Sequence, residues 1–129
     1  MKNDTVIKNC KIVNEGIVKE ADVLIRKGRI EKIASDIAAE GNIIDAAGLH
    51  LFPGVIDDQV HFREPGSTDA EDLNSGSRAA VAGGITSVFE MPNTNPPTSS
   101  KVEFYKKLKL AKNRMYCNYA FYFGATPDN

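Results

Sequence analysis

The sequence contains little of what usually points to a function at first sight. Among its 129 residues there are two cysteines, two histidines and no tryptophan. Cys10 and Cys117 match no Cys-x-x-Cys or zinc-ribbon spacing, so we expect two reduced thiols that pack as small apolar side chains. No apolar run approaches the ~20 residues of a membrane span, and the first residues lack the apolar region of a signal peptide. We therefore expect a cytoplasmic protein without a membrane partner.

Net charge is also missing, because 16 basic residues nearly balance 17 acidic ones and leave a formal charge of -1. A surface of this kind has no overall attraction for phosphate backbones, so we expect no nucleic-acid partner. The one basic cluster lies in a segment with helical periodicity, and we interpret it as a solvated helix face with cations near its C-terminus. It consists of Lys106, Lys107, Lys109, Lys112 and Arg114.

The first part of the chain, residues 1–50, has the pattern of short strands. Apolar and polar residues alternate over 5–13 and again over 21–34. Turns are expected at 14–16 and at Lys27 and Gly28, and 42–45 adds a further apolar run. Alternation with tight turns is typical of strands. We predict a small antiparallel β unit in this region.

From residue 51 the pattern changes to alternating strands and helices. A helix over 69–84 has Asp69 or Asp72 available as its N-cap and two glycines at its end, and a second helix begins after Ser100 with Glu103 in a capping-box position. Strands are expected before, between and after these helices, at 52–62, 85–92 and 117–125. The β-α-β-α-β order predicts parallel strands with right-handed crossovers.

Two architectures fit that order, an open doubly wound sheet and a (β/α)8 barrel. No GxGxxG motif follows the first strand, which argues against dinucleotide binding. Both architectures collect ligands at the carboxyl ends of their strands, and so predict one functional face that holds His61, Arg63, Asn93 and residues 124–128.

The stretch "DDQVHFREPG" concentrates ionisable groups at such a strand end. Alternate residues of a strand share a face, so Asp57, Gln59, His61 and Arg63 are expected on one side. Two histidines at positions 59 and 61 would present two imidazoles to one metal ion, but position 59 is glutamine. A lone histidine is compatible with a metal ligand or with a hydrogen-bonded structural residue.

Arg63 and Asn93 are candidates for binding a ligand. The guanidinium fork suits a carboxylate or phosphate, and the amide both donates and accepts. A surface ion pair for Arg63 and a turn-forming role for Asn93 explain the same residues. Asp57 and Asp58 are adjacent on a strand, point to opposite sides and cannot form a catalytic dyad.

Three phrases, "GNIIDAAGLHLFPG", "PGVIDDQVHFREPG" and "SRAAVAGGITSVFEMPNTNPPT", resemble the N-terminal part of a dihydroorotase, in the cyclic amidohydrolase branch of the amidohydrolase superfamily. Allantoinases are close relatives. The resemblance implies a metal-dependent (β/α)8 barrel preceded by strands of a small β-sandwich domain. Residues 1–50 are then part of that composite domain, and 51–129 are the first three strands and two helices of an incomplete barrel.

The resemblance also assigns roles to residues. The superfamily pattern Gly-x-x-Asp-x-His-x-His falls on Gly54, Asp57, Gln59 and His61, which implies His61 as a metal ligand and Asp57 as its support. The arginine and asparagine that bind the substrate carboxylate in dihydroorotases correspond to Arg63 and Asn93. The implied reaction is the reversible hydrolysis of dihydroorotate to N-carbamoyl-aspartate in pyrimidine biosynthesis, with one or two zinc ions.

Two departures from the family pattern matter. Gln59 replaces a histidine, and its amide is a weaker zinc ligand, so we expect the inner metal position to be poorly held or empty. A barrel needs roughly 250 residues and eight strands, so we expect the general base beyond Asn129 and no activity from this N-terminal fragment alone. The alternatives are an allantoinase-like or hydantoinase-like hydrolase, or a non-catalytic homologue that acts as a structural or regulatory partner. The family also suggests a homo-oligomer or a pathway-enzyme partner.

Overall fold

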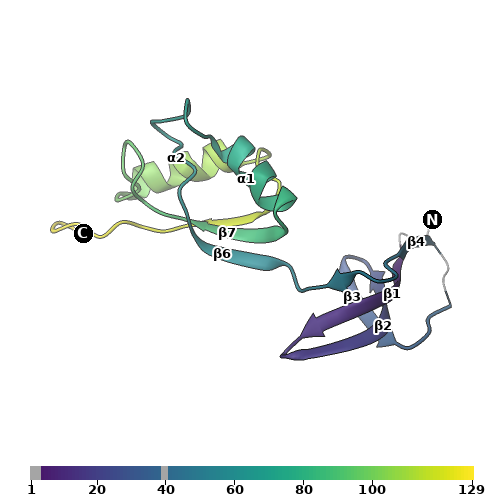
Figure 1. The fold of residues 1–129 in the computed structure, drawn as a ribbon. Coiled ribbons are helices and arrows are strands. Elements are labelled where there is room, and N and C mark those ends of the chain that lie inside the picture. Colours follow the sequence, from purple (N-terminus) through teal and green to yellow (C-terminus); the bar gives the residue numbers. More distant parts are fainter. Residues whose placement is uncertain (1–3, 39–40) are drawn as a thin grey trace. The chain divides into compact units, whose positions relative to one another are not determined.

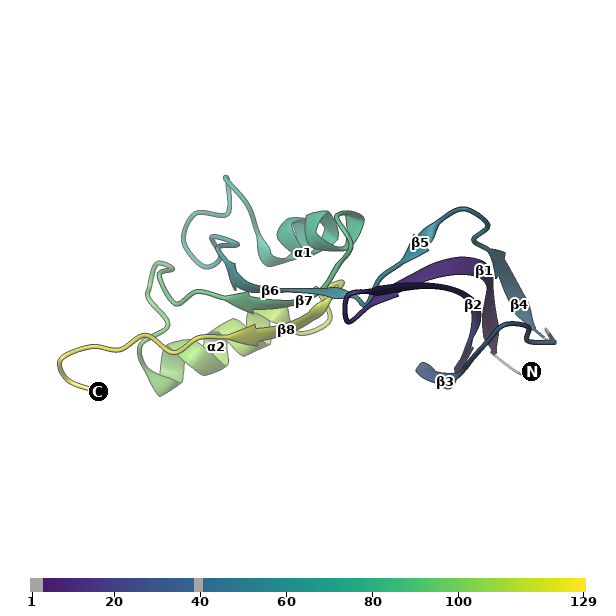
Figure 2. The ribbon, with the colours of Figure 1, turned by 60° about the horizontal axis from the view of Figure 1, so that its bottom comes forward.

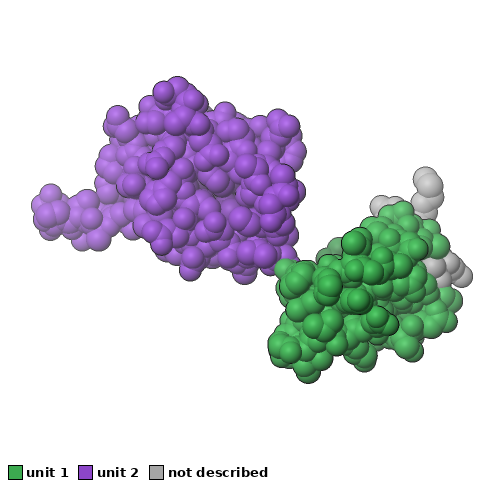
Figure 3. Space-filling view, in the orientation of Figure 1, with its two compact units in different colours: residues 1–53 green, residues 54–129 purple. Residues whose placement is uncertain are grey.

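The computed structural model describes residues 4–38 and 41–129. It divides the chain into two compact units, residues 1–53 and residues 54–129 (Figure 3). Each unit has its own sheet and its own cluster of buried apolar side chains, so each is described by itself. None of the helices in the described part of the chain is long and apolar enough to cross a membrane.

The first unit is a five-stranded sheet (Figure 1). β1 (Thr5–Asn14) pairs antiparallel with β2 (Ile17–Arg26), which pairs antiparallel with β3 (Arg29–Ala34). β4 (Asn42–Asp45) and the short β5 (His50–Leu51) both pair with β1 in parallel orientation. The prediction of an antiparallel unit is therefore wrong for β4, because the chain runs along β1 in the same direction after β3, and the sequence predicted no strand at β5.

Two tight turns set the antiparallel pairing. Glu15 and Gly16 have φ values of 50° and 75°, and Lys27 and Gly28 have 51° and 73°. Positive φ at both central residues is the geometry of hairpin turns whose twist matches that of the strands. The turns predicted at these sites are confirmed.

The apolar side chains of this sheet are only partly covered. Cys10, Val23 and Ala46 form the buried cluster, whereas Ile17 and Ile30 are 66% and 68% exposed. A single sheet with large apolar side chains in solvent is what one layer of a β-sandwich looks like.

A buried carboxylate fixes an irregularity in the same sheet. The pairing of β1 with β2 shifts between Ile7 and Cys10, and Asn9 there has a φ of 59°. Asp22 accepts hydrogen bonds from the backbone N–H of Asn9 and of Ile37, both at 2.9 Å. Lys8 Nζ lies 2.6 Å from the same carboxylate. Asp22 thus satisfies two backbone donors that regular strand pairing leaves unpaired.

The second unit is a three-stranded parallel sheet in the order β6-β7-β8, with helices between consecutive strands (Figure 2). The elements in chain order are β6 (Val55–Val60), α1 (Leu73–Ala82), β7 (Ile85–Glu90), α2 (Lys101–Ala111) and β8 (Asn118–Phe121). Both helices begin at residues anticipated from the sequence. Asp72 caps α1 and Ser100 caps α2, each accepting the N–H of the residue three positions later.

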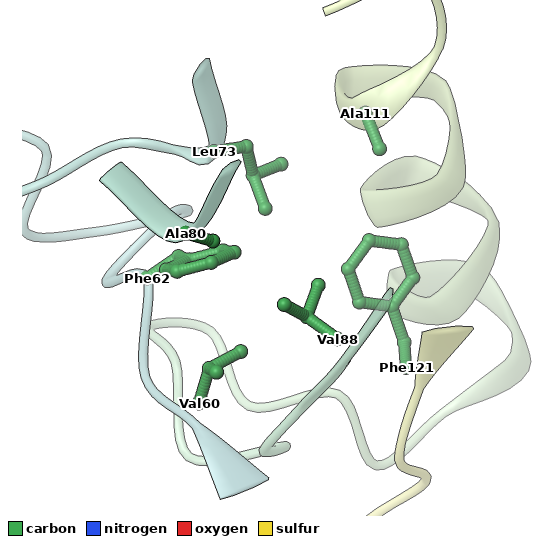
Figure 4. Packing of buried hydrophobic residues seen from close by; sticks show 7 residues of the cluster. All are labelled: Val60, Phe62, Leu73, Ala80, Val88, Ala111 and Phe121. Carbon is green, nitrogen blue, oxygen red and sulfur yellow. The ribbon is translucent and has the colours of Figure 1, made fainter. Parts of the chain in front are cut away.

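One apolar cluster joins both helices to the sheet, so both lie on the same face of it (Figure 4). Its buried members are Val60, Phe62, Leu73, Ala80, Val88, Ala111 and Phe121. Helix α1 approaches closely because Gly76 has no side chain: a Cβ there would lie 2.4 Å from Cδ1 of Phe62. The core thus begins within β6 and continues into the loop that follows it.

We expect Asp22→Asn to destabilise the first unit. Its bond with Lys8, followed by the N–H of Asn9, lowers the pKa of Asp22 below its ordinary value. A carboxyl with a lowered folded-state pKa contributes stability above the ordinary value of about 4, and loses it as the pH falls through the folded-state pKa. Urea unfolding of the variant should therefore show a lower midpoint at pH 7 and a smaller loss of stability below pH 4.

Asp36→Asn is the matched control, because Asp36 contacts the same Lys8 Nζ at 2.8 Å while its side chain is 87% exposed. Equal effects of the two substitutions would contradict the role given to Asp22.

Candidate functional site

The carboxyl ends of β6, β7 and β8 open into neighbouring segments, here called loop 61–66, loop 91–98 and segment 122–128. Backbone bonds keep them in step: Met91 N–H donates to Val60 O, and Tyr122 N–H donates to Glu90 O, both at 2.9 Å. An open hollow of about 380 Å³ lies at these strand ends. It is lined by Asp58, Gln59, Met91, Pro92, Tyr122, Phe123, Gly124 and Ala125.

Burial alternates along the stretch that the sequence singled out. Strand β6 ends at Val60, yet Val60, Phe62 and Glu64 are all buried. The residues between them, His61 and Arg63, are half-buried and exposed. The alternation therefore continues past the strand, with one set of side chains facing the helices and the other set left accessible.

His61 and Asn93 meet across the two loops. The Nδ1 of His61 donates to the Oδ1 of Asn93 at 2.9 Å, although the residues are 32 positions apart. An amide oxygen only accepts, so Nδ1 carries the proton in this pair, and the neutral tautomer with this proton has its lone pair on Nε2. Neither the sequence pattern nor the resemblance predicted this contact.

The two loops also touch through their backbones. Asn95 N–H donates to Pro65 O at 3.0 Å. Gly66 lies against Asn95, where an added Cβ would come within 2.6 Å of the Asn95 carbonyl oxygen. Loop 61–66 and loop 91–98 therefore hold each other in a fixed relation.

Arg63 is exposed and has a φ of 60°. This left-handed conformation is uncommon for a residue with a side chain. It lies between the accessible His61 and the buried Glu64. Within residues 4–38 and 41–129, the guanidinium of Arg63 forms no ion pair, so its hydrogen-bond donors face solvent.

The candidate metal-site residues Asp57 and Gln59 lie in the irregular part of β6. Asp57 Oδ1 accepts the backbone N–H of Gln59 at 3.1 Å, and the pairing of β6 with β7 is irregular between Asp57 and Val60. The described residues contain no group of three or more His, Cys, Asp or Glu side chains able to hold a metal ion. The donor chemistry fits one imidazole ligand, His61 through Nε2, with a carboxylate and an amide nearby in sequence.

A buried carboxylate supports loop 61–66 from below. Glu64 accepts two hydrogen bonds from Arg114, at 2.7 and 3.0 Å. Its Oε2 also accepts the N–H of Leu73 at 2.9 Å, in the first turn of α1. Glu64 therefore joins the loop to α1 and to the residues that follow α2, with the bidentate geometry that makes Arg–carboxylate pairs strong.

A buried ion pair contacts loop 91–98. Lys107 of α2 and Glu90 at the end of β7 are each 1% exposed, and Lys107 Nζ lies 2.5 Å from Glu90 Oε2. Burial raises the pKa of Glu90 above its ordinary value, and the ammonium of Lys107 opposes that rise. Because both charged groups are desolvated, moving either side chain away would leave the other charge buried without a partner.

The prediction of a solvated basic helix face is wrong for Lys107 and for Arg114. Lys107 is buried, and Arg114 lies beyond the helix with Glu64 as its partner. The sequence did carry a signal for Lys107, which falls three residues after Phe104 and four before Ala111, on the apolar stripe of α2. Both cysteines are free; Cys10 is buried as expected and Cys117 is half-buried.

Comparison with known proteins places these features in a family. The profile of the "Amidohydrolase family" matches residues 50–128. An allantoinase of Desulfitobacterium hafniense is 40% identical over 128 residues, which cover 98% of this chain and 28% of that protein. A dihydroorotase of Methanosarcina acetivorans is 42% identical over 125 residues, which cover 95% of this chain and 27% of that protein.

The structure is similar to solved enzymes as well. The L-hydantoinase (dihydropyrimidinase) from Arthrobacter aurescens matches with a TM-score of 0.88 and 34% identity, over 98% of this chain and 29% of that one. A D-hydantoinase matches with a TM-score of 0.83 and 31% identity, over 97% and 28%. The predicted fold class, the first part of such a barrel preceded by sandwich strands, is confirmed. The chain spans a little over a quarter of the length of these relatives.

We expect Arg114→Lys to loosen loop 61–66. Lysine cannot reproduce the two parallel bonds to Glu64, which leaves a buried carboxylate oxygen without its donor. The free energy of unfolding should fall by about 1–2 kcal/mol, measured by urea denaturation.

Arg78→Lys is the control, because Arg78 is an exposed arginine of α1 that lies over the ring of Tyr116 at 6.0 Å. An Arg114→Lys variant as stable as the control would show that Glu64 needs only a positive charge nearby.

Proposed function

Because the chain belongs to the amidohydrolase family, we propose that it supplies the N-terminal part of a metal-dependent cyclic amidohydrolase that acts on dihydroorotate. The reaction is the reversible hydrolysis of the ring amide to N-carbamoyl-aspartate. The observation that carries this choice is the solvent-facing guanidinium of Arg63, two residues from the His61–Asn93 pair. Dihydroorotate carries a carboxylate, whereas allantoin and hydantoin do not.

The chain's own residues would bind and orient this anion. Arg63 offers a planar fork of donors to the carboxylate. Asn93 uses its oxygen on His61, so its amide NH₂ remains as a second donor. A cation and a neutral donor on two loops that hold each other would fix both the position and the tilt of the ring.

The same arrangement would prepare His61 for a divalent ion such as zinc. A ligating histidine commonly donates its other ring N–H to an oxygen, which fixes the tautomer and the ring orientation. Asn93 Oδ1 supplies that oxygen, leaving Nε2 as the donor, with Asp57 as a supporting carboxylate. A bound ion would add Lewis acidity toward the ring carbonyl and an activated water. The further ligands and the general base would come from residues outside these 129.

A non-catalytic homologue is the second candidate, and Gln59 is the observation that favours it. A neutral amide at the position of a family histidine weakens one metal position. Such a protein would keep carboxylate binding and the fold while it served as a structural or regulatory partner of another enzyme.

We expect Arg63→Lys, made in a protein that contains this chain together with the rest of the barrel, to raise the KM for dihydroorotate on the order of tenfold. Lysine keeps the charge but loses the fork. Turnover of any ring amide without a carboxylate, such as hydantoin, should be unchanged, and Arg78→Lys should change neither.

The same assay on the unsubstituted protein, which contains this chain and the rest of the barrel, distinguishes the two candidates. Turnover of dihydroorotate supports the proposal, and turnover of allantoin or hydantoin alone contradicts the proposed substrate. Carboxylate binding without turnover of any of the three would point to the non-catalytic homologue.

Gln59→His should strengthen metal binding at His61. Two imidazoles two positions apart can face one ion, provided that the irregular part of β6 lets them align. Titration with Zn²⁺ followed by calorimetry should give at least a tenfold tighter Kd than for the parent chain, and the added His61→Ala should abolish the gain. Equal affinities for parent and variant would show that Gln59 is not the weak point of the site.

A further inference from the structure

Lys107 is 1% exposed and is not itself among the residues that line the hollow. Its Nζ lies 2.5 Å from Glu90 Oε2, 3.2 Å from Thr98 Oγ1 and 3.4 Å from Met91 O. Thr94 Oγ1 is at 3.5 Å. Apart from Glu90, all these acceptors belong to loop 91–98.

The position of Thr98 explains how one ammonium can shape a whole loop. Thr98 is 1% exposed. Its N–H donates to Pro92 O at 2.9 Å, and its carbonyl accepts the N–H of Gly124 at 2.8 Å. The backbone of Thr98 therefore bonds within loop 91–98 and to segment 122–128, while its hydroxyl oxygen accepts a hydrogen bond from Lys107.

Core stability alone does not account for an ion pair at this place. The attraction between two buried charges roughly offsets the free energy lost when they are desolvated. An apolar pair of similar volume often stabilises the fold as much or more. What an apolar pair cannot do is donate hydrogen bonds to Thr98 and to the Met91 carbonyl. The polar contacts of Lys107 thus lead toward the loop that holds Asn93.

We propose that Lys107, held by Glu90, is a positioning residue that sets loop 91–98 through Thr98 and thereby places Asn93 against His61. The inference rests on the proposed function in one respect, since Asn93 and His61 are taken as the residues that face substrate and metal. The positioning itself is a property of the loop and is measured without any ligand.

Thr98→Val provides the sharpest test, because valine matches the shape of threonine, removes the hydroxyl and leaves the Glu90–Lys107 pair in place. Amide hydrogen exchange of the ¹⁵N-labelled chain is followed by NMR. We expect exchange at Asn95 and Thr98 to accelerate on the order of tenfold while amides of β7 keep their protection. The ¹⁵N shifts of the His61 ring should also move, reporting loss of the Nδ1–H bond to Asn93.

The double variant Glu90→Leu with Lys107→Met separates positioning from stability. It replaces the ion pair by apolar side chains, so its urea midpoint should lie close to that of the unsubstituted chain. Lys107→Met alone should be much less stable, because it leaves the buried Glu90 carboxylate without a cation. The exchange of loop 91–98 should remain fast in the double variant. Lys106→Met is the control, since exposed Lys106 has Glu103, at 2.8 Å, as its one ion-pair partner in the described part of the chain.

Two outcomes overturn the proposal. One is unchanged loop exchange and unchanged His61 signals in Thr98→Val. The other is faster exchange spread evenly over loop and β7, which would mean a general loss of stability. If the double variant does not fold, Thr98→Val decides alone. Faster loop exchange in Thr98→Val together with an unchanged KM for dihydroorotate in Arg63→Lys would support the positioning role of Lys107. The same pair of results would contradict the proposed binding of the substrate carboxylate by Arg63.

Discussion

The second unit depends on two carboxylates that turn inward where their strands end. Glu64 follows β6, and Glu90 is the last residue of β7. Glu90 forms an ion pair with a lysine of α2, and Glu64 forms one with an arginine just after α2. An uncompensated buried carboxylate costs several kcal/mol, so Lys107 and Arg114 have to be brought to these places. That requirement fixes how α2 lies on the sheet, which in turn fixes the two loops above it.

The apolar core supplies the other half of the constraint. Each strand contributes one buried apolar side chain to the face that the helices cover, namely Val60, Val88 and Phe121. Gly76 lets α1 come close enough to cover Phe62. Dispersion and burial hold the layers together without specifying any direction for the loops. Direction comes from the polar contacts at the strand ends, such as those of Arg114 with Glu64 and of Lys107 with Thr98.

Local patterns were enough to predict most of the framework. The parallel β-α-β-α-β order, the cap at Ser100 and the two hairpin turns follow from periodicity and from turn residues, which also narrowed the first helix cap to Asp69 or Asp72. The parallel pairing of β4 and β5 with β1 did not follow, because strand direction across a long connection is set by tertiary packing. The buried state of Lys107 was missed for a related reason: five basic residues within nine positions suggest a solvated face, and only the register with Phe104 and Ala111 indicates otherwise.

The candidate site shows the same division between local and long-range information. His61, Arg63 and Asn93 could be selected from the sequence because polar residues after buried strands gather at one edge. Their relation to each other could not, since the His61–Asn93 bond depends on how two loops meet. That bond is formed within this unit. The loops are held by contacts inside the unit, from Asn95 to Pro65 and from Lys107 to Thr98, so the relation between His61 and Asn93 needs no residue from another segment. A metal ion would then find Nε2 of His61 already oriented, and its affinity would be decided by the residues that complete the coordination sphere, with Gln59 as the weakest contribution from this chain.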